Sequence, residues 1–105
     1  NINNEKSIIK FINHIDYYPF KLNKKLEVVR LATNISKKIG FSGENIPCSG
    51  GLDANWLVKK NIPTITFGNG HYKPHSIDEY LDIREFKDAC IYAIALAKNI
   101  NKWLL

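Results

Sequence analysis

Residues 48–83 read CSGGLDANWLVKKNIPTITFGNGHYKPHSIDEYLDI, and they carry most of the information on how this chain folds. The Ser-Gly-Gly turn at 49–51 precedes a pattern that predicts a short helix over residues 53–60. Residues 62–67 form a β-prone run bounded by glycines, which predicts a strand. A loop rich in Gly, His and Pro then continues through Ser76.

The flanking segments predict further elements. Residues 8–18 are rich in β-branched and aromatic types and end at a proline, which predicts a strand, and a short strand is expected at 44–48. Helical spacing from Asn23, as N-cap, to a stop at Gly40 predicts the first helix. The last helix begins with a capping-box pattern, Asp82 and Glu85. Its apolar stripe comprises Ile83, Phe86, Ala89, Cys90, Ala93, Ile94, Ala97 and Ile100.

The order strand, helix, short strand, short helix, strand, helix predicts an α/β fold, with helices packed on a small sheet. The 105 residues suit one domain at most and a modest core. Fifteen basic residues against ten acidic ones give a net charge of +5, which permits anionic partners without requiring them. The sequence shows no signal-peptide pattern and no membrane-length apolar run. Cys48 and Cys90 lack metal-type spacing, which favours reduced thiols in a cytoplasmic protein.

The loop at residues 49–55 is the first candidate site. Its paired glycines, Gly50 and Gly51, let a ligand approach the backbone closely, and the N–H groups at the start of the following helix favour an anion such as a carboxylate. The alternative is purely structural, with Asp53 capping its helix and the glycines turning the chain.

The loop at residues 68–80 is the second candidate site. Its side chains include two histidines, His71 and His75, and two carboxylates, Asp78 and Glu79, all of which are donors that zinc accepts. It follows a predicted strand, and open α/β sheets bind ligands beyond the carboxyl ends of their strands. The alternative is that both histidines are simply solvated.

Three segments together, 49–55, 61–68 and 74–80, resemble the C-terminal end of co-catalytic zinc metallopeptidases. This is the family of peptidase T, carboxypeptidase G, aminoacylase and succinyl-diaminopimelate desuccinylase, and the sequence resembles peptidase T-like aminopeptidases most. The resemblance is strong over 48–83 and fainter over 17–100. It implies that residues 1–20 are the end of an inserted lid domain and a re-entry strand, and that 21–105 are the C-terminal part of the catalytic domain.

The resemblance also implies roles for individual residues. His75 matches the last metal ligand of the family, while Glu79 is expected to orient the His75 loop and His71 has no assigned role. The substrate-binding residues it implies are Gly50, Gly51, Asp53 and Asn55. Leu52 stands where the family commonly has Ser or Thr, which leaves substrate details open.

The family's other catalytic motifs are a His-x-Asp motif, a bridging aspartate and a Glu-Glu pair that supplies the general base. This chain has no Glu-Glu pair, so no catalytic residue is assigned to it. His14 and Asp16 would share one face of a strand, but they lie too close to the C-terminal motifs, and we interpret them as a chance match.

The resemblance therefore implies the C-terminal fragment of an enzyme that uses two zinc ions and activated water to hydrolyse short peptides. The fragment alone would be inactive and would bind zinc weakly. Its partners would be the peptide substrate, the N-terminal part of the catalytic domain and, through an uncovered apolar face, a second copy of itself, with no nucleic acid or membrane partner. The alternative is a stand-alone basic α/β binding module without catalysis, for which the charge of +5 would matter.

Overall fold

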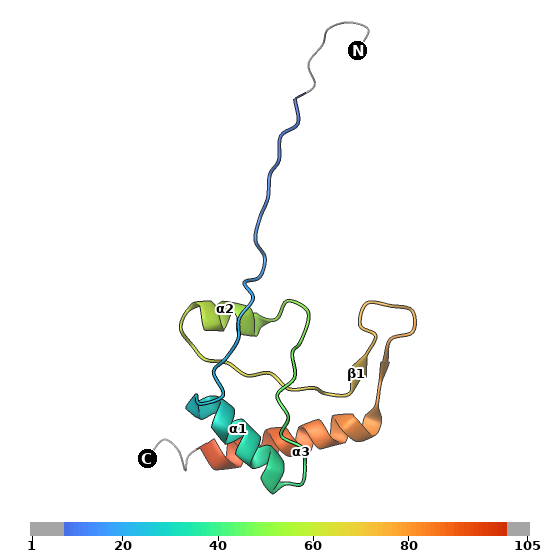
Figure 1. Cartoon of the computed structure of the whole chain (residues 1–105). Helices are drawn as coiled ribbons and strands as arrows, with labels where there is room; N and C mark the ends of the chain where they lie inside the picture. Colours follow the sequence, from blue (N-terminus) through green and yellow to red (C-terminus); the bar gives the residue numbers. More distant parts are fainter. Residues whose placement is uncertain (1–7, 101–105) are drawn as a thin grey trace, which may run out of the picture.

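The computed structural model describes residues 8–100, which form three helices and a two-stranded antiparallel sheet (Figure 1). In chain order the elements are α1 (Glu27–Lys38), α2 (Asp53–Lys59), β1 (His71–Tyr72), β2 (Tyr80–Leu81) and α3 (Ile83–Ile100). The fold is therefore a small α/β arrangement, as predicted. No helix within 8–100 has the length and apolar composition needed to cross a membrane.

Helix α1 ends as predicted, but its N-cap is Leu26, three residues after the proposed cap. The carbonyl of Asn23 accepts the N–H of Leu26, and its side chain accepts the N–H of Lys25, so Asn23 makes a turn ahead of the helix. At the other end Gly40 has φ +90°, and the N–H of Phe41 donates to the carbonyl of Ser36 at 3.0 Å. This is a Schellman ending, in which glycine takes the left-handed conformation at low cost.

The core lies between α1 and α3. Helix α1 buries Val29, Ala32 and Ile35 toward it, and α3 contributes Tyr92. The Tyr92 hydroxyl donates to the carbonyl of Ala32 at 2.9 Å, and its ring meets Phe67 edge-on at 5.0 Å. Tyr92 therefore joins both helices to the segment at 62–67.

Helix α3 begins at the predicted cap. Asp82 Oδ1 accepts the N–H groups of Arg84 and Glu85 at 2.8 and 3.0 Å, which satisfies two donors of the first turn. The reciprocal half of the predicted capping box does not form, because the N–H of Asp82 donates to Gly70 and the Glu85 carboxylate accepts the hydroxyl of Tyr72. These bonds tie the β1–β2 hairpin to the start of α3.

Three predicted strands are wrong: residues 8–18, 44–48 and 62–67 form no strand in the structure. Their composition gives extended backbone, but a β-ladder needs a neighbouring strand, and within residues 8–100 none pairs with them. Residues 8–15 run away from the helices, with Ile8 92% and Phe11 89% exposed (Figure 1). The observed strands lie in the loop that we predicted to be irregular, in the register His71–Leu81 and Tyr72–Tyr80.

The apolar stripe of α3 exists but is not the face that packs on α1. Residues two positions apart on a helix point to nearly opposite sides, because successive residues turn by about 100°. Cys90 and Ile94 therefore face away from Tyr92, the residue that contacts α1. Most of the predicted stripe is exposed, with Ile83 57% and Ile94 55% accessible to solvent.

Candidate functional site

The β1–β2 hairpin carries His75 in the loop between its strands. The rings of Tyr72 and Tyr80 stack with centroids 5.1 Å apart, and the Tyr72 hydroxyl lies 2.7 Å from both carboxylate oxygens of Glu85. This hydrogen bond, aided by the nearby negative charge, raises the pKa of Tyr72. The hydrogen bond between Tyr72 and Glu85 therefore holds the hairpin, and with it the His75 loop, against the first turn of α3.

The backbone of His75 is held in an uncommon conformation. Its φ is +66°, in the left-handed region that few non-glycine residues adopt, and Lys73 nearby has φ +49°. The N–H of His75 donates to Glu79 Oε2 at 2.7 Å, and the Ser76 hydroxyl donates to the carbonyl of Lys73 at 2.8 Å. Residue His75 is exposed to solvent. Such conformations occur often at functional sites and require local contacts to maintain them.

Glu79 orients the loop, as expected from the sequence. Besides the bond to the His75 backbone, its Oε1 lies 3.1 Å from Nε2 of His71. The hydrogen bond from the His75 N–H, and then that from His71, lowers the pKa of Glu79. Both carboxylate oxygens of Glu79 are thus engaged. Through this contact His71, the first residue of β1, helps to hold the loop.

The donors do not form a complete metal site. Catalytic zinc sites use three protein ligands, and within residues 8–100 no three His, Cys, Asp or Glu side chains gather closely enough to hold a metal ion. Asp78 pairs with Lys73 at 3.7 Å, and His71 pairs with Glu79. The described residues can therefore supply one metal ligand, His75, but not a complete metal site. We derive no metal-dependent step from them.

The loop at 49–52 and helix α2 hold the other predicted site residues. Gly50 has φ +125° with open space beside its Cα, whereas a Cβ on Gly51 would overlap the ring of Tyr17. The open face of the glycine pair thus belongs to Gly50, and Gly51 accommodates an aromatic side chain. Asp53 begins α2 as its first helical residue and is exposed, and Leu52 occupies the cap position.

Asn55 has a position that sequence reasoning did not anticipate. Its buried side chain accepts the N–H of Leu52 at 2.9 Å and donates to the carbonyl of Tyr18 at 2.8 Å. The amide therefore links the glycine loop to the segment before α1, 37 residues away in sequence. In this structure Asn55 shapes the loop through backbone contacts.

A cation–π cluster holds the same segment on α2. The Lys59 ammonium lies 3.7 Å from the ring centroid of Tyr18 and 5.0 Å from that of Trp56, and the two rings meet edge-on at 6.1 Å. Such contacts contribute roughly 0.5–1 kcal/mol when exposed. Sequence reasoning missed this cluster, although the spacing of Trp56 and Lys59 on one helix face was a usable signal.

The two candidate loops remain separate in the structure. Both lie above the α1–α3 pair in the view of Figure 1, but among the described residues no hydrogen bond or ion pair joins His75 to the glycine loop. Among the described residues, no hydrogen bond or ion pair joins His14 or Asp16 to either loop. Their side chains are 3.5 Å apart and 82% and 76% exposed, on extended chain instead of the predicted strand.

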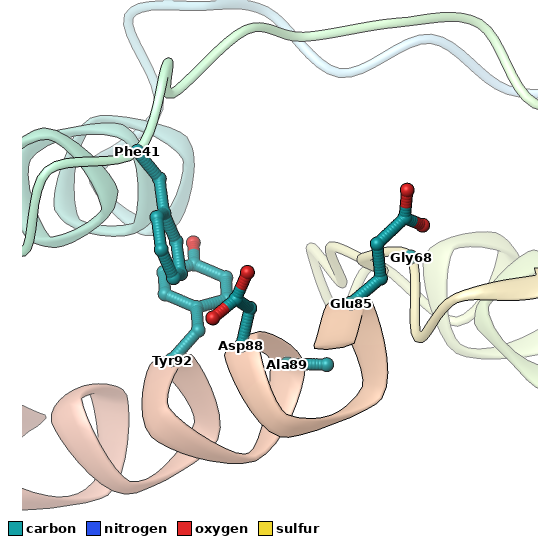
Figure 2. A pocket seen from close by; sticks show the side chains of 6 residues that line it. All are labelled: Phe41, Gly68, Glu85, Asp88, Ala89 and Tyr92. Carbon is teal, nitrogen blue, oxygen red and sulfur yellow. The ribbon is translucent and has the colours of Figure 1, made fainter. Parts of the chain in front are cut away.

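A shallow hollow lies elsewhere, between the end of α1 and the first turns of α3 (Figure 2). The Phe41 and Tyr92 rings lie together at one end of it, with the Asp88 carboxylate beside them, while Glu85 points away toward the hairpin. The hollow is lined by Phe41, Gly68, Glu85, Asp88, Ala89 and Tyr92. None of the predicted site residues belongs to it, so it does not join the two loops.

With this arrangement established, comparison with known proteins identifies the family. The family model described as Peptidase family M20/M25/M40 matches residues 7–99. The chain belongs to this family. The uncharacterised protein YqjE of Bacillus subtilis (strain 168) is 30% identical over 86 residues, which are 81% of this chain and 23% of that protein. No solved structure gives a significant match.

Membership of the M20/M25/M40 family relates the chain to peptidases and agrees with the broader resemblance seen in its motifs. The match includes both the glycine loop and the His75 hairpin. The chain spans only 23% of the length of YqjE, so the described loops represent a small part of a protein of that size.

Proposed function

We propose that this chain is the C-terminal part of the catalytic domain of a zinc-dependent peptidase that hydrolyses short peptides. We use "parent protein" for this chain together with the remainder of that domain. The motif order resembles peptidase T-like aminopeptidases, which favours tripeptides as substrates. Family membership and the short span of the chain relative to YqjE support the proposal.

The observation that carries the proposal is the presentation of His75. It is an exposed histidine in a loop held left-handed by Glu79, on a hairpin anchored to α3. Metal-binding histidines depend on neighbouring groups that fix their orientation. In our proposal His75 supplies one zinc ligand, and the parent protein supplies the others together with the general base.

The glycine loop contributes to the substrate pocket in this proposal. Gly50 leaves open space beside its backbone, and Asp53 follows at the exposed start of α2. Gly51 and Asn55 maintain the conformation of the loop. Gly51 leaves room for the Tyr17 ring, and the Asn55 side chain forms hydrogen bonds with the backbone of Leu52 and Tyr18. Backbone groups at 50 and 51 would then lie near the substrate carboxylate.

We also propose a domain boundary near residue 20 and a cellular location. In this proposal residues 1–20 are the end of a lid domain and the segment that re-enters the catalytic domain, and residues 21–105 belong to the catalytic domain. The docking of Tyr17 and Tyr18 on the glycine loop and α2 supports a change of environment near residue 17. We propose a cytoplasmic protein with peptide substrates and with no nucleic acid or membrane partner.

Paired histidine substitutions in the parent protein test this function. We expect His75→Ala to lower kcat/KM for tripeptide hydrolysis by more than about 100-fold and to reduce the bound zinc, because a direct ligand is lost. His14→Ala removes another exposed histidine and serves as the matched control, with both quantities unchanged. Normal zinc content and activity in His75→Ala would refute the proposal. Loss of zinc in His14→Ala would instead place the metal at His14 and Asp16.

A further inference from the structure

Asn69 and Gly70 form the only Asn-Gly pair in the sequence, and they lie directly before β1. An asparagine followed by glycine is open to spontaneous deamidation, because no side chain on the glycine hinders attack of its backbone nitrogen on the asparagine amide. Five other asparagines precede isoleucine, whose branched side chain obstructs this attack. The sequence thus sets Asn69 apart from the other asparagines.

The structure holds the Asn69 side chain in a conformation that brings the reacting groups together. The N–H of His71 donates to Asn69 Oδ1 at 3.2 Å, so the side chain folds back over the peptide bond between Asn69 and Gly70 as an Asx turn. The same hydrogen bond draws electron density toward Oδ1 and makes the amide carbon Cγ more electrophilic. Asn69 is exposed, so water reaches its amide and ammonia can leave.

The attacking nitrogen is not engaged in a hydrogen bond. Within residues 8–100, the N–H of Gly70 donates to no acceptor. Asn61 is the opposite case, because it is exposed and has φ +62° but the N–H of Ile62 donates to the carbonyl of Leu57 at 3.0 Å. An N–H that is already bonded to a carbonyl loses its proton less readily. Asn69 therefore meets conditions for deamidation that Asn61 does not.

We propose that Asn69 is a site of spontaneous deamidation and that its isoaspartyl product releases the β1–β2 hairpin from α3. The Gly70 nitrogen loses its proton to hydroxide and attacks Cγ of Asn69. The bond from Cγ to Nδ2 breaks as the new bond forms, and Nδ2 leaves as ammonia. Water then opens the cyclic imide at either carbonyl, which gives aspartate or isoaspartate. The net change takes up a water molecule, releases an ammonium ion and leaves a carboxylate on the chain.

The isoaspartyl product does not fit the place that Gly70 occupies. It adds a methylene carbon to the main chain before Gly70, which is buried. A Cβ on Gly70 would already lie 2.7 Å from the Asp82 carbonyl oxygen, so the glycine has little room to move toward α3. We therefore expect the product to break the 2.8 Å bond from the Asp82 N–H to the Gly70 carbonyl. It also removes the Asn69 acceptor of the His71 N–H.

This inference goes beyond the proposed function, because neither the reaction nor its effect on the hairpin requires a metal. The same hairpin presents His75 in the proposed function, so deamidation would also disturb that histidine. Both tests are made on the metal-free 105-residue chain. Their failure would leave the zinc assignment of His75 untouched, and a parent protein that binds zinc without His75 would leave this inference untouched.

Peptide mapping by mass spectrometry, during incubation of the 105-residue chain at mildly alkaline pH, tests the reaction. We expect Asn69 to convert at least about 10-fold faster than Asn61, because its amide and the attacking nitrogen are oriented for reaction. An isoaspartyl methyltransferase labels the expected product. The folded chain should convert Asn69 at least as fast as the same chain unfolded in urea. Slower conversion in the folded chain, or a rate at Asn69 no higher than at Asn61, would overturn the inference.

Amide hydrogen exchange measured by NMR tests the release of the hairpin. Asn69→Asp is the matched control, because it gains the same charge and keeps an acceptor oxygen but adds no methylene carbon to the main chain. We expect the Asp82 amide to exchange at least about 10-fold faster in the separated isoaspartyl product and less than about 2-fold faster in Asn69→Asp. Equal exchange in these two samples would overturn the release of the hairpin.

Discussion

The carboxylate of Glu79 accepts the backbone N–H of His75 at 2.7 Å, and this bond closes the loop of the β1–β2 hairpin. The same carboxylate lies 3.1 Å from His71. Because the bond acts on the backbone, it sets the direction in which the His75 side chain leaves the loop. It connects the sequence pattern, a histidine followed four residues later by a glutamate, with the proposed metal site.

Removing this bond should weaken metal binding without removing the ligand. We expect Glu79→Ala in the parent protein to reduce zinc affinity about 10- to 100-fold, the effect typical of losing a group that orients a ligand. Glu79→Gln keeps one acceptor oxygen and should retain more of the affinity. Competition titration with a chelating dye measures both values. Unchanged affinity in Glu79→Ala would show that the loop holds His75 without this contact.

The conformation of the loop should depend on pH at the acidic end. The pKa of Glu79 is lowered from 4.5 by its hydrogen bonds from His75 and His71, so the ionised form is favoured in the folded state. The stabilisation is therefore complete above the ordinary pKa and is lost as pH falls through the lowered pKa. Carboxyl NMR of the 105-residue chain should give a midpoint below 4.5, with the His75 amide shifting at the same pH. A midpoint above 4.5 would contradict the hydrogen bond.

The Tyr92 hydroxyl should stabilise the α1–α3 contact. Tyr92→Phe removes the buried bond to Ala32 and should lower the free energy of unfolding by about 1 kcal/mol. The exposed Tyr80 provides the control, because Tyr80→Phe removes a hydroxyl that donates no hydrogen bond to the described residues. Urea unfolding of the 105-residue chain compares them. Equal stability of the two variants would mean that the bond contributes nothing measurable.

Gly51 should be intolerant of any side chain while Tyr17 is present. Gly51→Ala places a methyl group in the space of the Tyr17 ring and should destabilise the docked segment by about 1 kcal/mol. Adding Tyr17→Ala removes the overlap, so the double variant should lose less than the sum of the two single changes. Urea unfolding followed by circular dichroism measures the three variants. Strict additivity would show that the two residues do not touch.

Local sequence signals predicted the helices well. Gly40 ends α1 and Asp82 caps α3 because both effects act within a few residues, and α2 follows the glycine loop as expected. The strands at 8–18 and 62–67 were wrong because composition favours extended backbone but does not supply a pairing partner. The loop at 68–80 was expected to be irregular, yet aromatic residues at 72 and 80 pair across a hairpin.

The residues of the candidate site also divide into those that local sequence signals indicated and those that only the structure showed. Sequence motifs singled out His75, the glycine pair and the orienting role of Glu79, whose two partners lie four and eight residues away along the chain. Contacts between distant segments could not be predicted, such as the Tyr17 ring on Gly51 and the Asn55 bond to Tyr18. The exposure of the apolar side of α3 could not be predicted either. A helical stripe in the sequence shows that one face is apolar, but it does not show which element packs on that face.

Zinc calorimetry on the 105-residue chain tests most directly whether His75 is one ligand of a site completed elsewhere. With one imidazole donor at the proposed site, we predict a Kd above about 10 μM and no well-defined stoichiometry, and His75→Ala should reduce this weak heat. The parent protein should bind zinc stoichiometrically and far more tightly. Stoichiometric sub-micromolar binding by the 105-residue chain, unchanged by His75→Ala, would contradict the account, because a complete metal site would then lie within the chain and not involve His75.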